Sequence, residues 1–281
     1  MRVPRRKPTV LVISSHVARG AVGNRAAVFA LERLGFPVVA VPTVTLPWHP
    51  GEGRATRIVP PDEAFAKLLG DLAGAPWLGE IGGILSGYLG AAGQAAPIAA
   101  LVEAVKARNP AALYLCDPVI GDEAGPYVPE PVIAAIREKL IPLADMATPN
   151  RHELGVIGGE VLTGNDDLIA ASRTTGVPET VVTSAFGKPN QAANLLVAPE
   201  GAHLATHAAL AAAPHGTGDL FAALYLAHRL DGTAAPEALR LAAGATYRLA
   251  ELAAGDSALP LAAGQEVLVS PEAFVALERL A

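Results

Sequence analysis

The sequence predicts an α/β fold in which a mostly parallel, doubly wound sheet carries helices on both faces. Short runs of β-branched residues alternate with stretches of helical periodicity, and this alternation is typical of parallel sheets. Aromatic residues make up only 5% of the chain while alanine is abundant, which suits helices packed closely on a sheet. No Ser- or Gly-rich linker divides the chain, so we expect a single domain over residues 1–281.

The expected elements follow from these patterns in chain order. Strands are expected over residues 10–14, 38–41, 81–86, 112–116, 146–148, 180–184 and 194–197. Helices are expected between them over residues 24–34, 63–72, 97–108, 131–139 and 167–174. After about residue 205 the chain changes to helices, expected over residues 218–229, 236–252 and 271–280. Ligands bind at the carboxyl ends of the strands in such sheets, so polar residues there are site candidates.

Charge and cysteine content exclude several classes of protein. The formal net charge is -6 with acidic and basic residues interspersed, so we expect no nucleic-acid partner. Cys116 is the only cysteine, which rules out an intrachain disulfide and fits a reducing cytoplasm. No segment reaches the ~18 apolar residues of a membrane span, and residues 1–7 are expected to be a tail rather than part of a signal peptide. We therefore expect a cytoplasmic protein with no membrane partner.

The chemistry is expected at the segment His215-Gly216-Thr217-Gly218-Asp219, which precedes an apolar helix. Two glycines at a helix start let backbone N–H groups converge on a phosphate, and Gly218 is expected to adopt a positive φ. The positive helix end holds a first-turn carboxylate ionised, so Asp219 suits a proton acceptor in phosphoryl transfer. The alternative is a turn followed by an acid that is favoured there for structural reasons alone. The chain has no Gly-x-x-x-x-Gly-Lys motif, which excludes a Walker-type nucleotide site.

Polar residues also follow strand after strand. They are Ser15 and His16, Ser86 to Tyr88, Asp117, Thr148 to Asn150, and Thr183 with Ser184. Mg²⁺ prefers oxygen ligands and is held in kinases by one or two carboxylates plus substrate phosphates, so Asp117 and Glu153 are candidates. The alternatives are a turn residue for Asp117 and a capping acid paired with Asn150 for Glu153.

Five blocks of the chain resemble the pyridoxal kinases of the ribokinase-like class of small-molecule kinases. The blocks are residues 14–27, 85–90, 116–122, 148–153 and 216–223, in matching order over nearly the whole chain. The first and third are specific to pyridoxal kinases, and the fourth is shared more widely. The resemblance implies the ribokinase-like three-layer αβα fold and ATP-dependent phosphorylation of the 5′-hydroxymethyl group of pyridoxal, pyridoxine and pyridoxamine.

The resemblance also implies a role for each matching position. Asp219 is expected to be the catalytic base, and Gly216, Thr217 and Gly218 to line the anion hole. The expected vitamer-binding residues are Ser15, Val22, His49, Tyr88 and Asp219. The expected ATP-binding residues are Asp117, Thr148, Asn150, Glu153, Thr183, Ser184 and His215, and the expected metal residues are Asp117, Asp122 and Glu153. The implied cofactors are ATP and Mg²⁺, with K⁺ as a further cation, and the implied assembly is a homodimer.

One segment departs from the family pattern. Where many relatives carry Phe-Ser-Asn-His-Thr, this chain has Leu-Pro-Trp-His-Pro at residues 46–50. His49 matches, whereas Pro50 has neither a side-chain donor nor an N–H group in place of the threonine. Trp48 is expected either to cover the aromatic ligand or to pack on the core. Residues 46–54 are rich in Pro and Gly and are expected to form a mobile loop over the site.

Two other functions stay open at this point. One is a kinase of the same class that acts on hydroxymethylpyrimidine or a sugar, and the block containing Ser15 and His16 argues against it. The other is a non-catalytic vitamer-binding protein, which has no need of Asp219 beside an anion hole. A Ser–His hydrolase is disfavoured because adjacent side chains of a strand point to opposite faces. Cys116 is expected to be a buried apolar residue.

Overall fold

The computed structural model describes residues 7–271 and 275–280, which build a nine-stranded sheet between two layers of helices. The parallel strands are β1 (Thr9–Val17), β2 (Val38–Leu46), β3 (Ile81–Ser86), β4 (Leu113–Cys116), β7 (Met146–Ala147) and β8 (Glu179–Ala185). The antiparallel strands are β9 (Gln191–Ala198), β10 (Gly201–Ala208) and β11 (Ala276–Leu280). The spatial order is β11-β10-β9-β8-β7-β4-β3-β1-β2. The expected mostly parallel sheet is confirmed.

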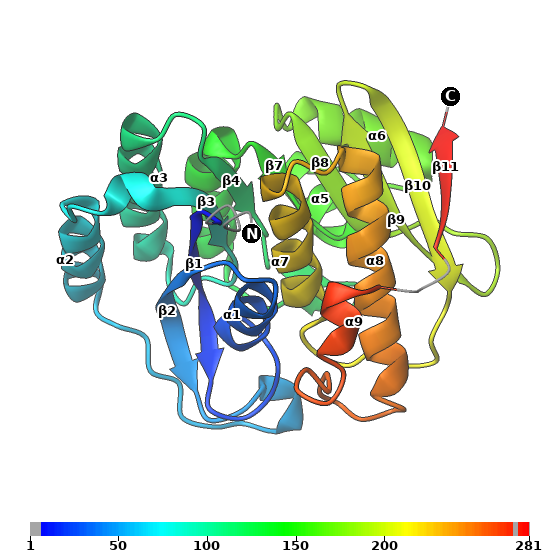
Figure 1. Ribbon diagram of the computed structural model, residues 1–281, viewed down its shortest axis with the longest axis horizontal. Coiled ribbons are helices and arrows are strands. Elements are labelled where there is room, and N and C mark those ends of the chain that lie inside the picture. Colours follow the sequence, from blue (N-terminus) through cyan, green and yellow to red (C-terminus); the bar gives the residue numbers. More distant parts are fainter. Residues whose placement is uncertain (1–6, 272–274, 281) are drawn as a thin grey trace, which may run out of the picture.

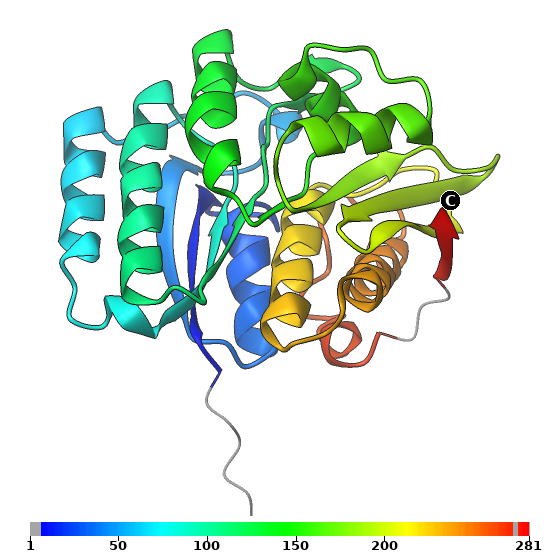
Figure 2. The same ribbon diagram turned by 90° about the horizontal axis from the view of Figure 1, so that it is seen from above.

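Helices cover both faces of this sheet (Figures 1 and 2). One face carries α1 (Asn24–Arg33), α7 (Thr217–Leu230) and α8 (Ala235–Leu252), with the short α9 (Glu266–Val269) beside them. The other face carries α2 (Asp62–Ala73), α3 (Ala95–Arg108), α4 (Glu130–Ala135), α5 (Arg151–Gly158) and α6 (Asn165–Thr174). Single turns occur at Pro50–Glu52, Leu78–Glu80, Ala92–Gln94, Ile136–Leu140 and Ile141–Leu143, and β5 (Gly121–Asp122) pairs with β6 (Gly125–Pro126).

The alternation of side chains along β1 explains why both faces need a helical layer. Val10 and Val12 are fully buried in the core that α1, α7 and α8 form. Leu11 and Ile13, which point to the opposite face because a strand has period two, are buried in the core of α2 and α3. Because apolar side chains of this strand lie on both faces of the sheet, neither face can be exposed to solvent, and helices cover both sides.

The chain path places a topological switch point at β1. The strand has β2 as one neighbour and β3 as the other, both parallel to it. The helix α1, which leads to β2, packs on one face, and α2, which leads to β3, packs on the other. The order of strands therefore reverses at β1, and open α/β sheets bind ligands at the carboxyl ends of the strands at such a point.

Two parts of the antiparallel edge differ from the sequence prediction. The helix predicted over residues 271–280 is wrong, because residues 276–280 form β11 and pair with β10; residues 272–274 lie outside the described residues. Residues 201–208 form the unpredicted strand β10, which pairs along its length with β9. Both segments are poor in β-branched residues, and their backbones gain a partner only from the neighbouring strand. No helix within the described ranges is long and apolar enough to cross a membrane.

Candidate active site

Asp219 stands in the first turn of α7, at the point where the strand order reverses. The backbone N–H of Gly23, which follows β1, donates a hydrogen bond to its carboxylate. A Cβ built on Gly87, which follows β3, would lie 4.0 Å from Asp219 Oδ1. The carboxylate therefore lies between the loops that leave β1 and β3. Sequence reasoning assigned no role to Gly23, although it lies in the block of residues 14–27.

The surroundings of Asp219 make it a stronger base than the sequence suggested. Burial raises the pKa of Asp219 to about 6, and the hydrogen bond from Gly23 opposes this shift. The pKa rises because loss of solvent outweighs the effect of the helix end, although the expected ionised form still dominates at neutral pH. A carboxylate with this pKa is still mostly ionised at neutral pH and accepts a proton more readily than an exposed aspartate.

The two glycines of the expected anion hole have different structural roles. Gly216 adopts φ 89° and caps α7, and a Cβ on it would lie 1.8 Å from the carbonyl oxygen of Ala21. Only glycine fits there. Gly218 has no positive φ, contrary to the sequence prediction, and a Cβ on it would meet nothing within 4 Å. The backbone of Gly218 and Thr217 thus borders open space at the amino end of α7, where unpaired N–H groups attract an anion.

Three residues predicted to bind the vitamer lie around Asp219. Ser15 is buried, and its carbonyl oxygen packs against Gly23, only 2.2 Å from where a Cβ of that residue would lie. Val22 is buried as well, and its Cγ1 would lie 3.2 Å from a Cβ on Gly216. Tyr88 is half-buried, and its N–H donates to Ser14 Oγ at 3.2 Å. The structure thus brings Ser15, Val22 and Tyr88 to the base.

Tyr88 is held by groups that sequence reasoning did not single out. Its carbonyl oxygen accepts a hydrogen bond from Thr43 Oγ1 at 2.6 Å. Arg57 Nη2 donates to the Tyr88 hydroxyl at 3.3 Å and to the carbonyl oxygen of Gly90 at 2.8 Å. Arg57 is exposed in an irregular loop, and no local sequence signal distinguishes it from other surface arginines.

Asp117 forms the centre of the group of carboxylates predicted for the nucleotide side. It is buried at the end of β4, and Thr148 Oγ1 donates a hydrogen bond to its Oδ1 at 2.9 Å. Burial, followed by the charges of Glu153 and Asp219, raises the pKa of Asp117 well above its usual range, while the Thr148 hydrogen bond opposes the shift. Asp117 is therefore in contact with Thr148 and within electrostatic reach of Asp219.

Glu153 is both a capping residue and part of this group. Its Oε2 accepts the N–H of Asn150 at 2.8 Å, and its own N–H donates to Asn150 Oδ1, so the capping box is confirmed. Its Oε1 accepts the N–H groups of Ile120 at 2.9 Å and Gly121 at 3.3 Å. Burial raises the pKa of Glu153 to about 7 in spite of these hydrogen bonds. Glu153 therefore joins α5 to the loop after β4.

The remaining predicted residues of this side lie at its edge. Asp122 accepts hydrogen bonds from the Tyr127 hydroxyl and from the N–H of Ala124 at 2.8 Å, and the former is the main reason that its pKa is lowered. Thr183 pairs with Asn150 as an isolated parallel bridge, and the exposed Ser184 has φ 53°. Within residues 7–271 and 275–280 no group of three His, Cys, Asp or Glu side chains is arranged to hold a metal ion.

His49 was predicted to bind the vitamer and His215 to bind ATP, but the two side chains lie in contact with each other. Their rings stack with centroids 3.8 Å apart.

Trp48 does not pack on the core, because its side chain is 38% exposed and its Nε1 donates to the carbonyl oxygen of Gly53 at 3.1 Å. His16 lines a groove along α1. Cys116 is buried, as expected, and burial raises its pKa to about 12.

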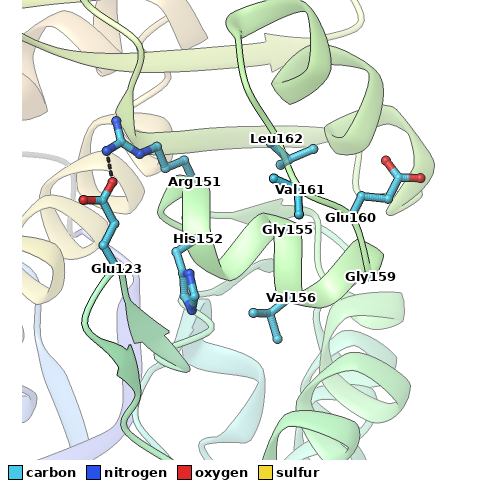
Figure 3. Close-up of a pocket in the computed structure, with 9 residues that line it drawn as sticks. All are labelled: Glu123, Arg151, His152, Gly155, Val156, Gly159, Glu160, Val161 and Leu162. Carbon is cyan, nitrogen blue, oxygen red and sulfur yellow. Dashed lines mark hydrogen bonds and ion pairs between the residues drawn. The ribbon is translucent and has the colours of Figure 1, made fainter.

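A separate cavity of about 430 Å³ opens beside α5 (Figure 3). Arg151, in the first turn of α5, forms an ion pair with Glu123 at its edge. The other lining residues are His152, Gly155, Val156, Gly159, Glu160, Val161 and Leu162. Asn150 and Glu153 do not line it, so it is distinct from the group of carboxylates around Asp117.

Comparisons with known proteins show the family of this chain. A family model described as phosphomethylpyrimidine kinase matches residues 87–261. The chain is 38% identical to pyridoxal kinase PdxY of Rubrobacter xylanophilus over 97% of both chains, and 36% identical to that of Leifsonia xyli over 96% of this chain and 99% of the relative. Its structure is similar to that of pyridoxal kinase from Leishmania donovani in complex with ADP and pyridoxamine, with a TM-score of 0.91, 28% identity and coverage of 98% and 100%. The chain belongs to the pyridoxal kinases of the ribokinase-like class.

Proposed function

We propose that this kinase transfers the γ-phosphoryl group of ATP to the 5′-hydroxymethyl group of pyridoxal, and of pyridoxine and pyridoxamine, in vitamin B6 salvage. The observation that carries the proposal is the position of Asp219, a carboxylate with a pKa of about 6 beside the glycine turn at the start of α7. The similar structures from Leishmania donovani hold ADP together with pyridoxamine or pyridoxine, which supports the pairing of a nucleotide with a vitamer.

In the proposed reaction Asp219 accepts the proton of the hydroxymethyl group. The hydroxymethyl oxygen then forms a bond to the γ-phosphorus, and the bond between that phosphorus and the bridging oxygen of ADP breaks. The N–H groups of Thr217 and Gly218 point from the end of α7 toward the space where charge develops on the phosphoryl oxygens. Gly23 keeps the carboxylate oriented during the proton transfer.

The vitamer is proposed to bind between the loops that follow β1 and β3. Ser15 and Val22 are proposed to border this space on one side and Tyr88 on the other, which their burial and the contact of Tyr88 with β1 support. In this arrangement Ser15 contacts the pyridine ring, while Val22 and Tyr88 shape the pocket. His49 is proposed to affect vitamer binding indirectly, by positioning the loop of residues 46–54.

The nucleotide and Mg²⁺ are proposed to bind on the side of Asp117. The donors there are carboxylate and hydroxyl oxygens, which fit Mg²⁺, and the ion would neutralise charge on the phosphates. Asp117 is proposed to hold the ion directly or through water, and Asp122 to act from the edge. Glu153 is proposed to contribute charge and to fix the loop, because its oxygens already accept N–H groups. Thr148, Asn150, Thr183, Ser184 and His215 complete the proposed nucleotide side.

The family resemblance supports two further parts of the proposal, a monovalent cation such as K⁺ and a homodimer. The lone buried Cys116 supports a reducing, cytoplasmic setting.

A substrate panel tests the proposal. Purified protein with MgATP is incubated separately with pyridoxal, pyridoxine, pyridoxamine and hydroxymethylpyrimidine, and ADP release is measured for each. We expect release with the three vitamers and a kcat/KM for hydroxymethylpyrimidine lower by at least ~10². A preference for hydroxymethylpyrimidine would assign the chain to the other kinase activity, and vitamer binding without ADP release would make it a carrier.

A further inference from the structure

The stacked rings of His49 and His215 join two loops of the site that are far apart in sequence. Their centroids lie 3.8 Å apart with an interplanar angle of 27°. His215 directly precedes Gly216, and its N–H donates to the carbonyl oxygen of Ser257 at 2.8 Å. His215 is therefore fixed by the backbone on one side and continues into the anion hole on the other.

His49 also holds the turn of its own loop. It is the N-cap of the turn Pro50–Glu52, and its Nδ1 accepts the N–H of Gly51 at 3.1 Å. An acceptor needs a free lone pair, so Nδ1 carries no proton in this arrangement. Protonation of that nitrogen removes the cap.

Gly51 shows how closely the turn approaches the ring pair. A Cβ on Gly51 would lie 2.9 Å from His215 Nε2 and 3.0 Å from His49 Nδ1. The start of the loop is tied to the segment after β1, where the N–H of Arg19 donates to the carbonyl oxygen of Pro47 at 2.9 Å. Its far end is tied to β2 by the backbone pair of Thr45 and Ile58. Between these ties, the contact with His215 fixes the tip.

The surroundings of His49 favour its neutral form. Two imidazolium ions at this distance repel each other, and the partly buried site gives little solvent screening. Burial and then His215 lower the pKa of His49, while the charge of Glu52 opposes them. Because a lowered histidine pKa means that the folded arrangement favours the neutral form, the contact is stable above that pKa and is lost as the pH falls through it.

We propose that His49 and His215 are a positioning pair, which in the neutral state holds residues 46–54 against the anion-hole turn and so shapes the vitamer side of the site. The inference rests on the proposed function for its kinetic consequence only. Pro50, which lacks the donor groups of the family's threonine, lies next to His49, and the ring pair gives this loop a different anchor. Loss of the pair is expected to raise KM for pyridoxal about tenfold and to change kcat less.

A cycle of His49→Ala, His215→Ala and the double variant tests the coupling. If the two rings act through each other, each single variant raises KM and the double variant is no worse than either. The control is His49→Phe/His215→Phe, which keeps two stacked rings without titratable nitrogens. Because phenylalanine lacks the Nδ1 acceptor of His49, we expect a KM at pH 8 between those of the parent protein and the double alanine variant, and no further rise toward about pH 5. Additive effects of the single variants would overturn the proposal.

A second measurement needs no substrate and is therefore independent of the proposed function. In a Trp77→Phe background only Trp48, which lies on the same loop, emits. We expect its fluorescence anisotropy to be lower in His215→Ala than in the parent at pH 8, and the parent to approach the variant value toward about pH 5. Anisotropy that is equal in the two proteins at pH 8 would overturn the inference even if pyridoxal is phosphorylated. A kinase that prefers another substrate, with the anisotropy change intact, would overturn only the proposed function.

Discussion

The N–H of Gly23 donates a hydrogen bond to the carboxylate of Asp219. This contact joins the loop after β1, which carries Val22, to the first turn of α7, beside the glycines proposed to line the anion hole. The base is therefore oriented by the same loop that borders the proposed vitamer site. A displacement of that loop would disturb the vitamer and the base together.

The pH dependence of kcat is expected to report Asp219. Its pKa is raised to about 6, and only the ionised form accepts a proton, so kcat should fall tenfold per pH unit below that value. The measurement is kcat at saturating pyridoxal, which reduces the contribution of the loop that carries His49. The control is Glu153→Gln, since the pKa of Glu153 is also raised, to about 7. An acid limb that disappears in this variant would assign the titration to Glu153 instead.

Alanine at Gly216 and at Gly218, the glycines proposed to line the anion hole, should have different effects. In Gly216→Ala the new methyl group meets the carbonyl oxygen of Ala21 and a residue with positive φ is strained, so the melting temperature should fall. In Gly218→Ala the methyl group meets open space, so stability should be unchanged while turnover is lost, because the space is where the phosphate is proposed to lie. Calorimetry and kcat measured on both variants check this. Full activity of Gly218→Ala would show that the phosphate does not lie beside Gly218.

The amide variants of Asp117 and Glu153 should have different effects on stability. Asp117→Asn removes a buried charge and should leave stability unchanged or higher, while it raises the Mg²⁺ concentration for half-maximal rate. Glu153→Gln loses one acceptor oxygen among N–H donors, so it should also lower the free energy of unfolding by about 1–3 kcal/mol. Metal titration and urea unfolding of both variants provide the measurement. Titrations that overlay the parent curve in both cases would exclude these residues from the environment of the ion.

The parallel half of the fold was predictable because its sequence pattern is strong. The first strand is apolar from Val10 to Ile13, and most of the helices between the strands show clear periodicity, so the prediction and the structure agree there except at α5, which was not predicted. The segment 271–280 contains Ala, Glu, Leu and Arg, which favour helices, yet residues 276–280 pair with Ala202–Thr206 of β10. That pairing depends on a partner distant in sequence, and no local pattern contains it.

The sequence predicted which residues form the candidate site better than it predicted the contacts between them. The resemblance pointed to Asp117, Glu153 and Asp219, and the structure brings Glu153 and Asp219 within electrostatic reach of Asp117. The dual use of Glu153 was visible in the spacing of the capping box. The stacking of His49 on His215 was not, because each was assigned to a different ligand and the contact depends on how two loops pack.

Asp219 is proposed to act as the base of a vitamer kinase. The most direct test of this claim is the rate of pyridoxal 5′-phosphate formation by the parent protein and by Asp219→Asn, with pyridoxal affinity measured on both by equilibrium binding. The amide keeps the shape of the side chain and the start of α7 but accepts no proton, so kcat should fall by roughly 10²–10⁴ with affinity changed far less. A folded Asp219→Asn protein that forms pyridoxal 5′-phosphate at the parent rate would contradict the claim.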